Sequence, residues 1–102
     1  MGRINWNDKA ENVHNKIRGM YPWPGTYFKY DEISIKAFNS DYYLEKTQKQ
    51  PGTVIKVNTE GVFVCTTDGI VVIKEIQVPG KKRMTVKEFL LGNTLQENII
   101  LE

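Results

Sequence analysis

The 102-residue sequence contains a single cysteine, Cys65, and a single histidine, His14. One cysteine excludes an internal disulfide and any multi-cysteine zinc cluster. One histidine leaves no His-x-x-x-His spacing, so the common zinc and iron sites are excluded as well. Because Val62, Phe63 and Val64 directly precede Cys65, we expect its thiol to be a buried small hydrophobe, and we expect no metal site.

Long apolar runs and phosphate-binding loops are also missing. No window approaches the roughly 18 consecutive apolar residues of a membrane span, and the N-terminus lacks the apolar segment of a secretory signal. Gly61 and Gly69 follow turn residues but precede strand-like runs, whereas a phosphate cradle opens a helix. We therefore predict a cytoplasmic protein with no membrane contact and no nucleotide hydrolysis.

The sequence also lacks a large excess of charge of either sign. With 14 Lys and Arg against 12 Asp and Glu, the net charge is +2, so affinity for an acidic partner depends on where the charges lie. Hydrophobic residues make up 40% and charged residues 25%, which is ordinary for a folded domain and too apolar for a disordered one. A chain of this length supports one core, so residues 1–102 are predicted to form a single domain.

The first predicted element is an amphipathic helix over about residues 8–18. Asp8 followed by Glu11 resembles a capping box, which satisfies free N–H groups of the first turn. Gly19 is a natural C-terminal stop. Three- and four-residue spacing defines one apolar stripe, consisting of Ala10, Val13, His14 and Ile17.

Beyond a proline-rich connector at residues 21–25, the pattern changes to five short strands, near 26–30, 33–38, 53–57, 62–66 and 70–78. Residues 39–52 read as a polar loop, and Asp68-Gly69 is the strongest hairpin signal. Thr85 with Glu88 predicts a capping box that opens a short helix over about 86–91, and residues 99–101 could add a last strand. We predict a mainly β fold with flanking helices: a small OB-like antiparallel barrel over about 26–78, because closing a sheet removes its exposed edges.

No pattern in the sequence predicts catalysis. His14 lies on the apolar stripe, where a packed histidine bonded to an asparagine or to backbone is the simplest interpretation. The adjacent pair Asp31-Glu32 is typical of a solvated turn and not of two carboxylates that bracket a scissile bond. We therefore expect no catalytic residue in this chain.

The pattern of cations is more informative. Three of them fall on one predicted loop, Lys81, Lys82 and Arg83, and strand positions add Lys29, Lys36, Lys56 and Lys74. Aromatic residues occur along the same strands, and cations with exposed aromatics are typical of a nucleic-acid-binding surface. The alternative, with equal weight from composition alone, is that these lysines are the ordinary wet face of a barrel.

A set of residues near the N-terminus keeps a distinctive order and spacing: Trp6, His14, Asn15, Arg18, Pro22, Trp23, Pro24 and Gly25. This set resembles the opening of the C-terminal domain of methionyl-tRNA formyltransferases. The similarity extends along essentially the whole chain, through residues 50–54, 67–69, 76–77, 80–84 and Phe89. We expect Trp6, Arg18, Trp23 and Pro24 to pin the helix to the barrel.

The resemblance implies an OB-like barrel that follows a Rossmann-like catalytic domain and helps to hold initiator tRNA through a basic surface. The parent enzyme would formylate the amino group of methionyl initiator tRNA in translation initiation. Its catalytic Asn, His and Asp and its 10-formyltetrahydrofolate site would belong to the catalytic domain, which is absent from this chain. We therefore expect this chain to need no cofactor and to catalyse no formyl transfer alone, and we expect the His14-Asn15 pair to be unrelated to catalysis.

One alternative parent remains open at this point. Similar C-terminal domains occur in formyltransferases that act on amino-sugar nucleotides, where the domain would serve as a structural part. The sequence departs from the usual family pattern at Tyr21, where asparagine is common, and at Thr26, where alanine is common. The resemblance therefore implies a formyltransferase, with either tRNA or a sugar nucleotide as the substrate of the parent.

Overall fold

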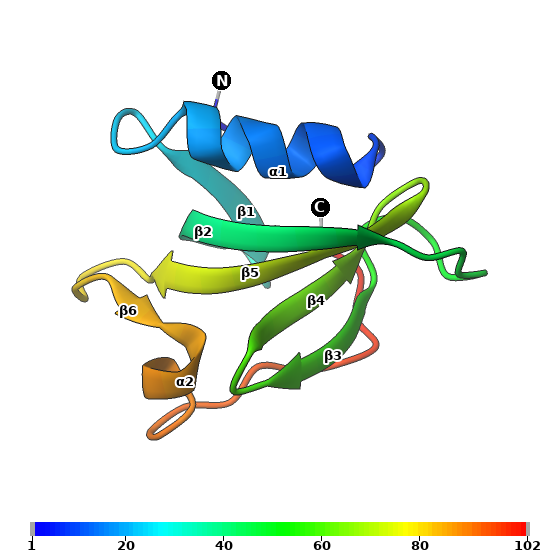
Figure 1. The fold of residues 1–102 in the computed structure, drawn as a ribbon. Coiled ribbons are helices and arrows are strands. Elements are labelled where there is room, and N and C mark those ends of the chain that lie inside the picture. The colour runs from blue at the N-terminus through cyan, green and yellow to red at the C-terminus, as the bar shows by residue number, and fades with distance from the viewer. Residues whose placement is uncertain (1, 102) are drawn as a thin grey trace.

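The structure is a computed structural model that describes residues 2–101, a twisted antiparallel sheet with one helix at each end (Figure 1). The predicted mainly β fold with flanking helices is confirmed. The helices are α1 (Ala10–Gly19) and α2 (Val86–Phe89), and the strands are β1 (Thr26–Tyr30), β2 (Ile33–Leu44), β3 (Val54–Asn58), β4 (Gly61–Cys65), β5 (Gly69–Gln77) and β6 (Met84–Thr85).

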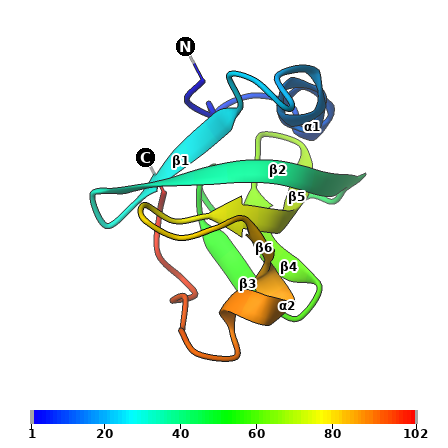
Figure 2. The same cartoon turned by 90° about the vertical axis from the view of Figure 1, so that its left-hand side faces the viewer.

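The sheet does not close into the predicted OB-like barrel. Its strand order is β1-β2-β5-β4-β3, with β6 added to β5, and within residues 2–101 no pairing joins β1 to β3. The two edges are covered by the ends of the chain (Figure 2). Tyr27 on β1 donates to the Gly2 carbonyl at 2.9 Å, and Val54 on β3 donates to the Ile99 carbonyl at 2.8 Å. These terminal segments satisfy edge groups that barrel closure would otherwise have satisfied.

The long strand β2 differs most from its prediction. The sequence predicted a loop from residue 39, but the strand continues to Leu44 because its second half pairs with β5, as Ser40 does with Ile73 and Tyr43 with Ile70. The register shifts around Asn39, so the strand bends there without ending. A polar strand of this kind is stable because its partner supplies the apolar surface. Strand β6 was not predicted, since two residues carry no readable alternation.

The main core lies between one face of the sheet and α1, with α2 at its far end. Val13 and Ile17 of α1 are buried in it, and Trp6 packs edge-on against Phe28 with ring centroids 6.1 Å apart. A smaller cluster lies on the outer face and contains Phe63, Cys65, Ile70 and Val72. The thiol of Cys65 is buried, as predicted.

The N-terminus of α1 is not capped as the sequence suggested. The Asp8–Glu11 capping box is absent, since the N-cap residue is Lys9 and it makes no side-chain cap. Instead the N–H of Ala10 donates to Asp68 Oδ1 at 2.9 Å, across a separation of 58 residues. Asp8 accepts from Asn12 at 2.9 Å, and this hydrogen bond is the first cause of the lowered pKa of Asp8. The β4–β5 hairpin therefore fixes where α1 begins.

The capping box of α2 is confirmed. The N–H of Glu88 donates to Thr85 Oγ1 at 3.1 Å, and the N–H of Thr85 donates to Glu88 Oε1 at 2.9 Å. The helix itself ends at Phe89, two residues before the predicted end. The backbone N–H of Thr85 and then its hydroxyl lower the pKa of Glu88, because both hydrogen bonds favour the charged carboxylate.

This capping box predicts an acid-dependent loss of stability. Because the pKa of Glu88 is lower in the folded state, its charge stabilises the fold above the ordinary glutamate pKa of about 4.3, and this contribution is lost as the pH falls through the folded value. Glu88→Gln should therefore be less stable than the native chain at neutral pH, with a gap that narrows in acid. Urea unfolding from pH 7 to pH 2 would measure the gap, and Glu45→Gln, an exposed glutamate without a cap role, is the control. A gap that stays constant into strong acid would contradict the prediction.

Candidate nucleic-acid interface

The four strand lysines predicted as contacts lie on the face of the sheet that points away from the main core. They alternate with core residues along their strands, and their positions are Lys29 on β1, Lys36 on β2, Lys56 on β3 and Lys74 on β5. The four lysines therefore share a face, but their surroundings divide them into two groups.

One group surrounds a shallow hollow at the end of the sheet, which we call the basic hollow. It has a volume of about 500 Å³ and is lined by Tyr27, Ser34, Lys36, Gln77, Val78, Pro79 and Gly80. Lys29 lies directly across from Ser34 in the β1–β2 pairing. Gln77 Nε2 donates to the Lys81 carbonyl at 2.9 Å, which ties the loop of residues 79–83, the basic loop, to the rim of the hollow.

Lys81 and Lys82 on the basic loop are exposed, and within residues 2–101 neither takes part in an ion pair. The N–H of Lys81 donates to the Val78 carbonyl at 3.1 Å, so the backbone of the loop is held while both ammonium groups remain in water. The basic loop and Lys36 thus present several hydrated cations on one end of the sheet.

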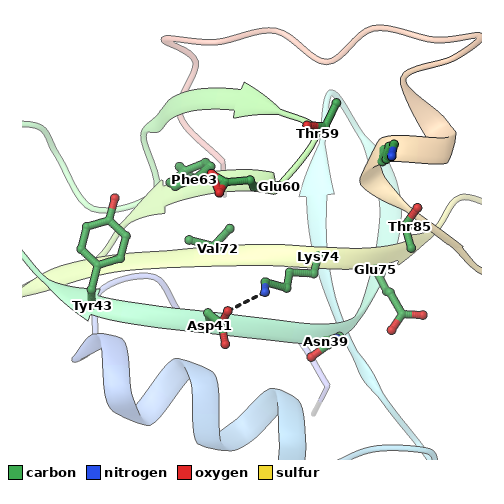
Figure 3. Close-up of a pocket in the computed structure, with 11 residues that line it drawn as sticks. Asn39, Asp41, Tyr43, Thr59, Glu60, Phe63, Val72, Lys74, Glu75 and Thr85 are labelled. Atoms are coloured by element: carbon green, nitrogen blue, oxygen red, sulfur yellow. Dashed lines mark ion pairs between the residues drawn. The ribbon is translucent and has the colours of Figure 1, made fainter.

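The second group lies at the middle of the outer face, where Lys74 lines a hollow of mixed charge (Figure 3) and Lys56 lies over Phe63, another lining residue. This hollow has a volume of about 530 Å³, and its lining includes Asp41, Glu60, Glu75 and Lys74. Lys74 Nζ is 2.6 Å from Asp41 Oδ2, so this lysine is already paired and is less available to a phosphate than the sequence implied. Lys56 Nζ lies 4.3 Å from the ring centroid of Phe63.

Arg83 differs from the other two cations of its loop because its side chain is held by neighbouring groups. Its Nε donates to Glu75 Oε2 at 2.9 Å and its Nη1 donates to the Tyr21 hydroxyl at 2.8 Å. The guanidinium lies 4.8 Å from the ring centroids of both Tyr21 and Phe38. The pKa of Arg83 is raised, first by the hydrogen bond to Glu75 and then by that to Tyr21. This cation is a structural clamp as well as a surface charge.

The sequence did not predict this clamp. Tyr21 and Phe38 are 17 positions apart along the chain, and their rings meet edge to face with centroids 6.2 Å apart. The only sequence feature that pointed to this clamp was the presence of aromatic residues in and near the proline-rich connector. The basic loop and the connector are brought together only by the pairing of β2 with β5.

The residues of the N-terminal signature have different roles in the structure. Trp6 is 4% exposed and packs as expected, whereas Trp23 is 80% exposed, so the expectation that it pins the helix is wrong. Arg18 and Pro24 are exposed too, as are Asn15 and Pro22. Gly25 is buried with φ at +83°, a conformation that glycine adopts without strain. Most of this signature therefore lies at the surface, and Trp6 and Gly25 are its buried members.

His14 makes a local polar contact at the half-buried edge of α1. Its Nδ1 lies 2.9 Å from Ser40 Oγ, and its ring centroid is 5.1 Å from that of Tyr42. The partner is thus a serine, where we expected an asparagine or backbone. Partial burial lowers the pKa of His14, the charge of Arg18 lowers it further, and Asp41 opposes them.

Residues 2–101 contain no group of three or more His, Cys, Asp or Glu side chains placed to hold a metal ion. No helix in the same range combines the length and apolar character needed to cross a membrane.

Comparison with known proteins adds the family. The family model described as formyl transferase, C-terminal domain, matches residues 1–94. A methionyl-tRNA formyltransferase of Clostridium novyi (strain NT) is 40% identical over 102 residues, which cover 100% of this chain and 33% of that protein. One of Rickettsia bellii (strain RML369-C) is 44% identical over 91 residues, or 89% of this chain and 29% of that protein.

Among solved structures, HypX from Aquifex aeolicus in complex with tetrahydrofolic acid aligns with a TM-score of 0.69 and 26% identity. The alignment covers 88% of this chain and 16% of HypX. The chain spans about a third of the length of the curated relatives that it matches. A family match over most of the chain, together with this structural likeness, leaves one assignment: the chain belongs to the formyl transferase C-terminal domain family.

Proposed function

We propose that this chain is the tRNA-positioning domain of a cytoplasmic methionyl-tRNA formyltransferase, whose catalytic domain formylates the amino group of methionyl initiator tRNA. The observation that carries the proposal is the basic hollow, where Lys36 and Lys29 lie beside the unpaired cations of the basic loop. Phosphate contacts of this kind fix the position of a long RNA without taking part in chemistry. The names of the relatives supply the substrate class.

In this proposal, formyl transfer takes place in the catalytic domain of the parent protein, outside this chain. The hollow of mixed charge is lined largely by lysines, carboxylates and hydroxyl groups, and the basic hollow is a shallow depression between Tyr27, Lys36 and Pro79. They offer no enclosed apolar slot for the fused ring of 10-formyltetrahydrofolate, so we derive no catalytic step through that cofactor here. The chain's own contribution is to bind RNA and to hold it in register for the catalytic domain.

We rank the candidate contacts by the surroundings of each cation. Lys81, Lys82 and Lys36 stay hydrated and lie at one end of the sheet, so we expect them to contribute most, with Lys29 in support. Lys74 is paired with Asp41 and Arg83 with Glu75, so removing either cation also releases a carboxylate and disturbs the fold locally. Lys56 lies over Phe63, away from the basic hollow, and we expect it to matter least.

The test is tRNA binding by the double variant Lys81→Ala and Lys82→Ala, measured by fluorescence anisotropy over a salt series. Each lost phosphate contact should lower the slope of log affinity against log salt by about 0.7 to 0.9. Weaker binding with a reduced slope, and a preference for tRNA over single-stranded DNA of equal length, is the expected result.

The matched control removes the same charge elsewhere. Lys46 and Lys49 are exposed on the loop between β2 and β3, at the opposite end of β5 from the basic loop. Replacing both by alanine should leave the salt slope nearly unchanged. If both double variants behave alike, binding reflects net charge only and the proposed site fails. If the native chain binds no tRNA at low salt, the positioning function itself is wrong, and the role as a structural part of a sugar-nucleotide formyltransferase becomes the better hypothesis.

A further inference from the structure

The connector between α1 and β1 presents an indole ring to solvent. Trp23 is 80% exposed, although a tryptophan that packs removes a large apolar area from water. The proline on either side, Pro22 and Pro24, restricts the backbone, and the N–H of Gly25 donates to the Met20 carbonyl at 2.8 Å, which closes the connector. The backbone that carries the indole is therefore restrained before a ligand binds, so a ligand that covers the ring has little further backbone to order.

The connector is fastened to the basic loop by the Arg83 clamp. Arg83 Nη1 bonds the Tyr21 hydroxyl at 2.8 Å, and the guanidinium lies against the rings of Tyr21 and Phe38. We call Tyr21, Trp23, Phe38 and Arg83 the aromatic corner. Because Lys82 is the neighbour of Arg83 in the chain, the indole and the cations of the basic loop belong to one held unit.

Charge at the aromatic corner selects the kind of partner. Arg18, in the last turn of α1, and Lys82 are exposed, and within residues 2–101 neither forms an ion pair. Glu75 contacts the corner, but Arg83 already occupies it. The connector that carries the exposed ring is thus tied to two segments with exposed cations: the N–H of Tyr21 donates to the Arg18 carbonyl at 3.3 Å, and Arg83, next to Lys82, bonds the Tyr21 hydroxyl. This combination fits a ligand that is both flat and anionic, as a nucleotide is. An ordinary apolar protein surface would gain nothing from the cations.

We propose that Trp23 is a stacking platform for one unpaired base of the bound RNA, with Arg18 and Lys82 on the flanking phosphates. The inference rests on the proposed tRNA-positioning function and deepens it, because it adds a contact to a nucleobase where the basic hollow contacts only the backbone. Every base has a flat face, so the platform selects unpaired nucleotides with little preference for sequence. Double-stranded stems would contact the basic hollow alone.

The experiment compares two single-stranded RNA oligonucleotides of equal length and charge, one with bases and one fully abasic. Fluorescence anisotropy of the labelled oligonucleotide measures the affinity of the native chain and of each variant. Indole emission of the native chain adds a readout of Trp23 itself, because Trp6 is 4% exposed and lies in the core. We expect the RNA with bases to quench the emission and to bind about tenfold more tightly than the abasic RNA, as one stacked base implies.

Variants at the platform sharpen the test. Trp23→Leu keeps an apolar side chain but cannot stack, and it should lose the tenfold preference for bases, with binding to the abasic RNA unchanged. Trp23→Phe should retain part of the preference. Leu91→Ala, which alters a leucine that is 86% exposed, is the control and should change neither affinity. An unchanged thermal midpoint would show that each variant is folded.

The outcomes separate this inference from the proposed function. Equal affinity for the two oligonucleotides, or a preference for bases that persists in Trp23→Leu, overturns the platform while salt-sensitive tRNA binding can still stand. Loss of the preference in Trp23→Leu, together with weaker binding of both oligonucleotides by Lys82→Ala, supports the platform and its phosphate contact. If Lys82→Ala leaves both affinities unchanged, the phosphate contact of Lys82 is wrong. If neither oligonucleotide binds at low salt, the platform is wrong and the exposed indole suits a protein surface.

Discussion

Trp6→Ala is expected to lower the free energy of unfolding by about 3 to 5 kcal/mol. The side chain is 4% exposed and packs edge-on against Phe28, so truncation leaves a cavity that the surrounding core cannot fill. Ile4, two positions earlier, is buried in the same core, and the segment they share covers the β1 edge. Since small domains are stable by only about 5 to 15 kcal/mol, the loss is a large fraction of the whole.

The second tryptophan provides the comparison. Trp23→Ala should change the free energy of unfolding by less than about 0.5 kcal/mol, because an exposed side chain loses little packing when it is truncated. Urea denaturation of both variants, followed by far-UV circular dichroism, measures the difference directly. Equal losses in the two variants would mean that the connector packs on the core after all.

Gly61→Ala is expected to cost about 3 kcal/mol or more. Gly61 begins β4 with φ at +151°, which L side chains rarely adopt. An added Cβ would overlap the Ile73 carbonyl oxygen and would lie 2.9 Å from Val72 Cγ1. The backbone of β5 cannot move aside without breaking hydrogen bonds of the β4–β5 pairing, so the overlap cannot be relieved by a small shift.

Gly80→Ala separates the two causes. Gly80 has φ at +78°, but a Cβ added there meets nothing within 4 Å, so the substitution carries only the conformational penalty of about 1 kcal/mol. Equilibrium unfolding in guanidinium chloride would show whether Gly61→Ala is the more damaging change. A loss at Gly61 no larger than that at Gly80 would mean that the sheet adapts to the added methyl group.

The two proposals assign the domain two different ways to contact RNA, one at the basic hollow and one at the aromatic corner. The hollow offers point charges, which bind phosphates with strong dependence on salt and little dependence on sequence. The corner offers a flat ring, whose contact with a base depends much less on salt. The basic loop joins the two surfaces, because Lys81 borders the hollow through Gln77 and Arg83 clamps the corner through Tyr21.

Local features of the fold followed from the sequence. The Thr85–Glu88 capping box, the amphipathic stripe of α1 and the Asp68-Gly69 hairpin depend on residues a few positions apart, so neighbouring side chains and turn chemistry determine them. The identity of the candidate contacts was also readable, since cations on predicted strands and on a predicted loop remain cations wherever the chain places them. The family signature could also be recognised from the sequence, because it consists of residue types in a fixed order and spacing.

The solvent accessibility of these cations could not be predicted from the sequence. Lys74 forms an ion pair with Asp41 and is therefore less available to a ligand, and Arg83 acts as a clamp. Both result from the pairing of β2 with β5, which brings carboxylates and aromatic rings from distant parts of the chain beside the two cations. Trp6 and Trp23 have the same side chain and both belong to the signature, yet one is buried and the other exposed. Burial depends on what packs above a side chain, and that is a property of the assembled sheet.

By itself, then, the sequence determined both helices, most of the strands, the residue types of the candidate contacts and the family, but not β6 or the second half of β2. Tertiary structure decided that the sheet stays open, because the terminal segments cover β1 and β3 in place of barrel closure. It also decided where α1 begins and where Arg83 points, through the Ala10–Asp68 and Arg83–Tyr21 hydrogen bonds, which join residues 58 and 62 positions apart. Contacts at such separations form only when strand pairing has brought the partners together, so no local pattern records them.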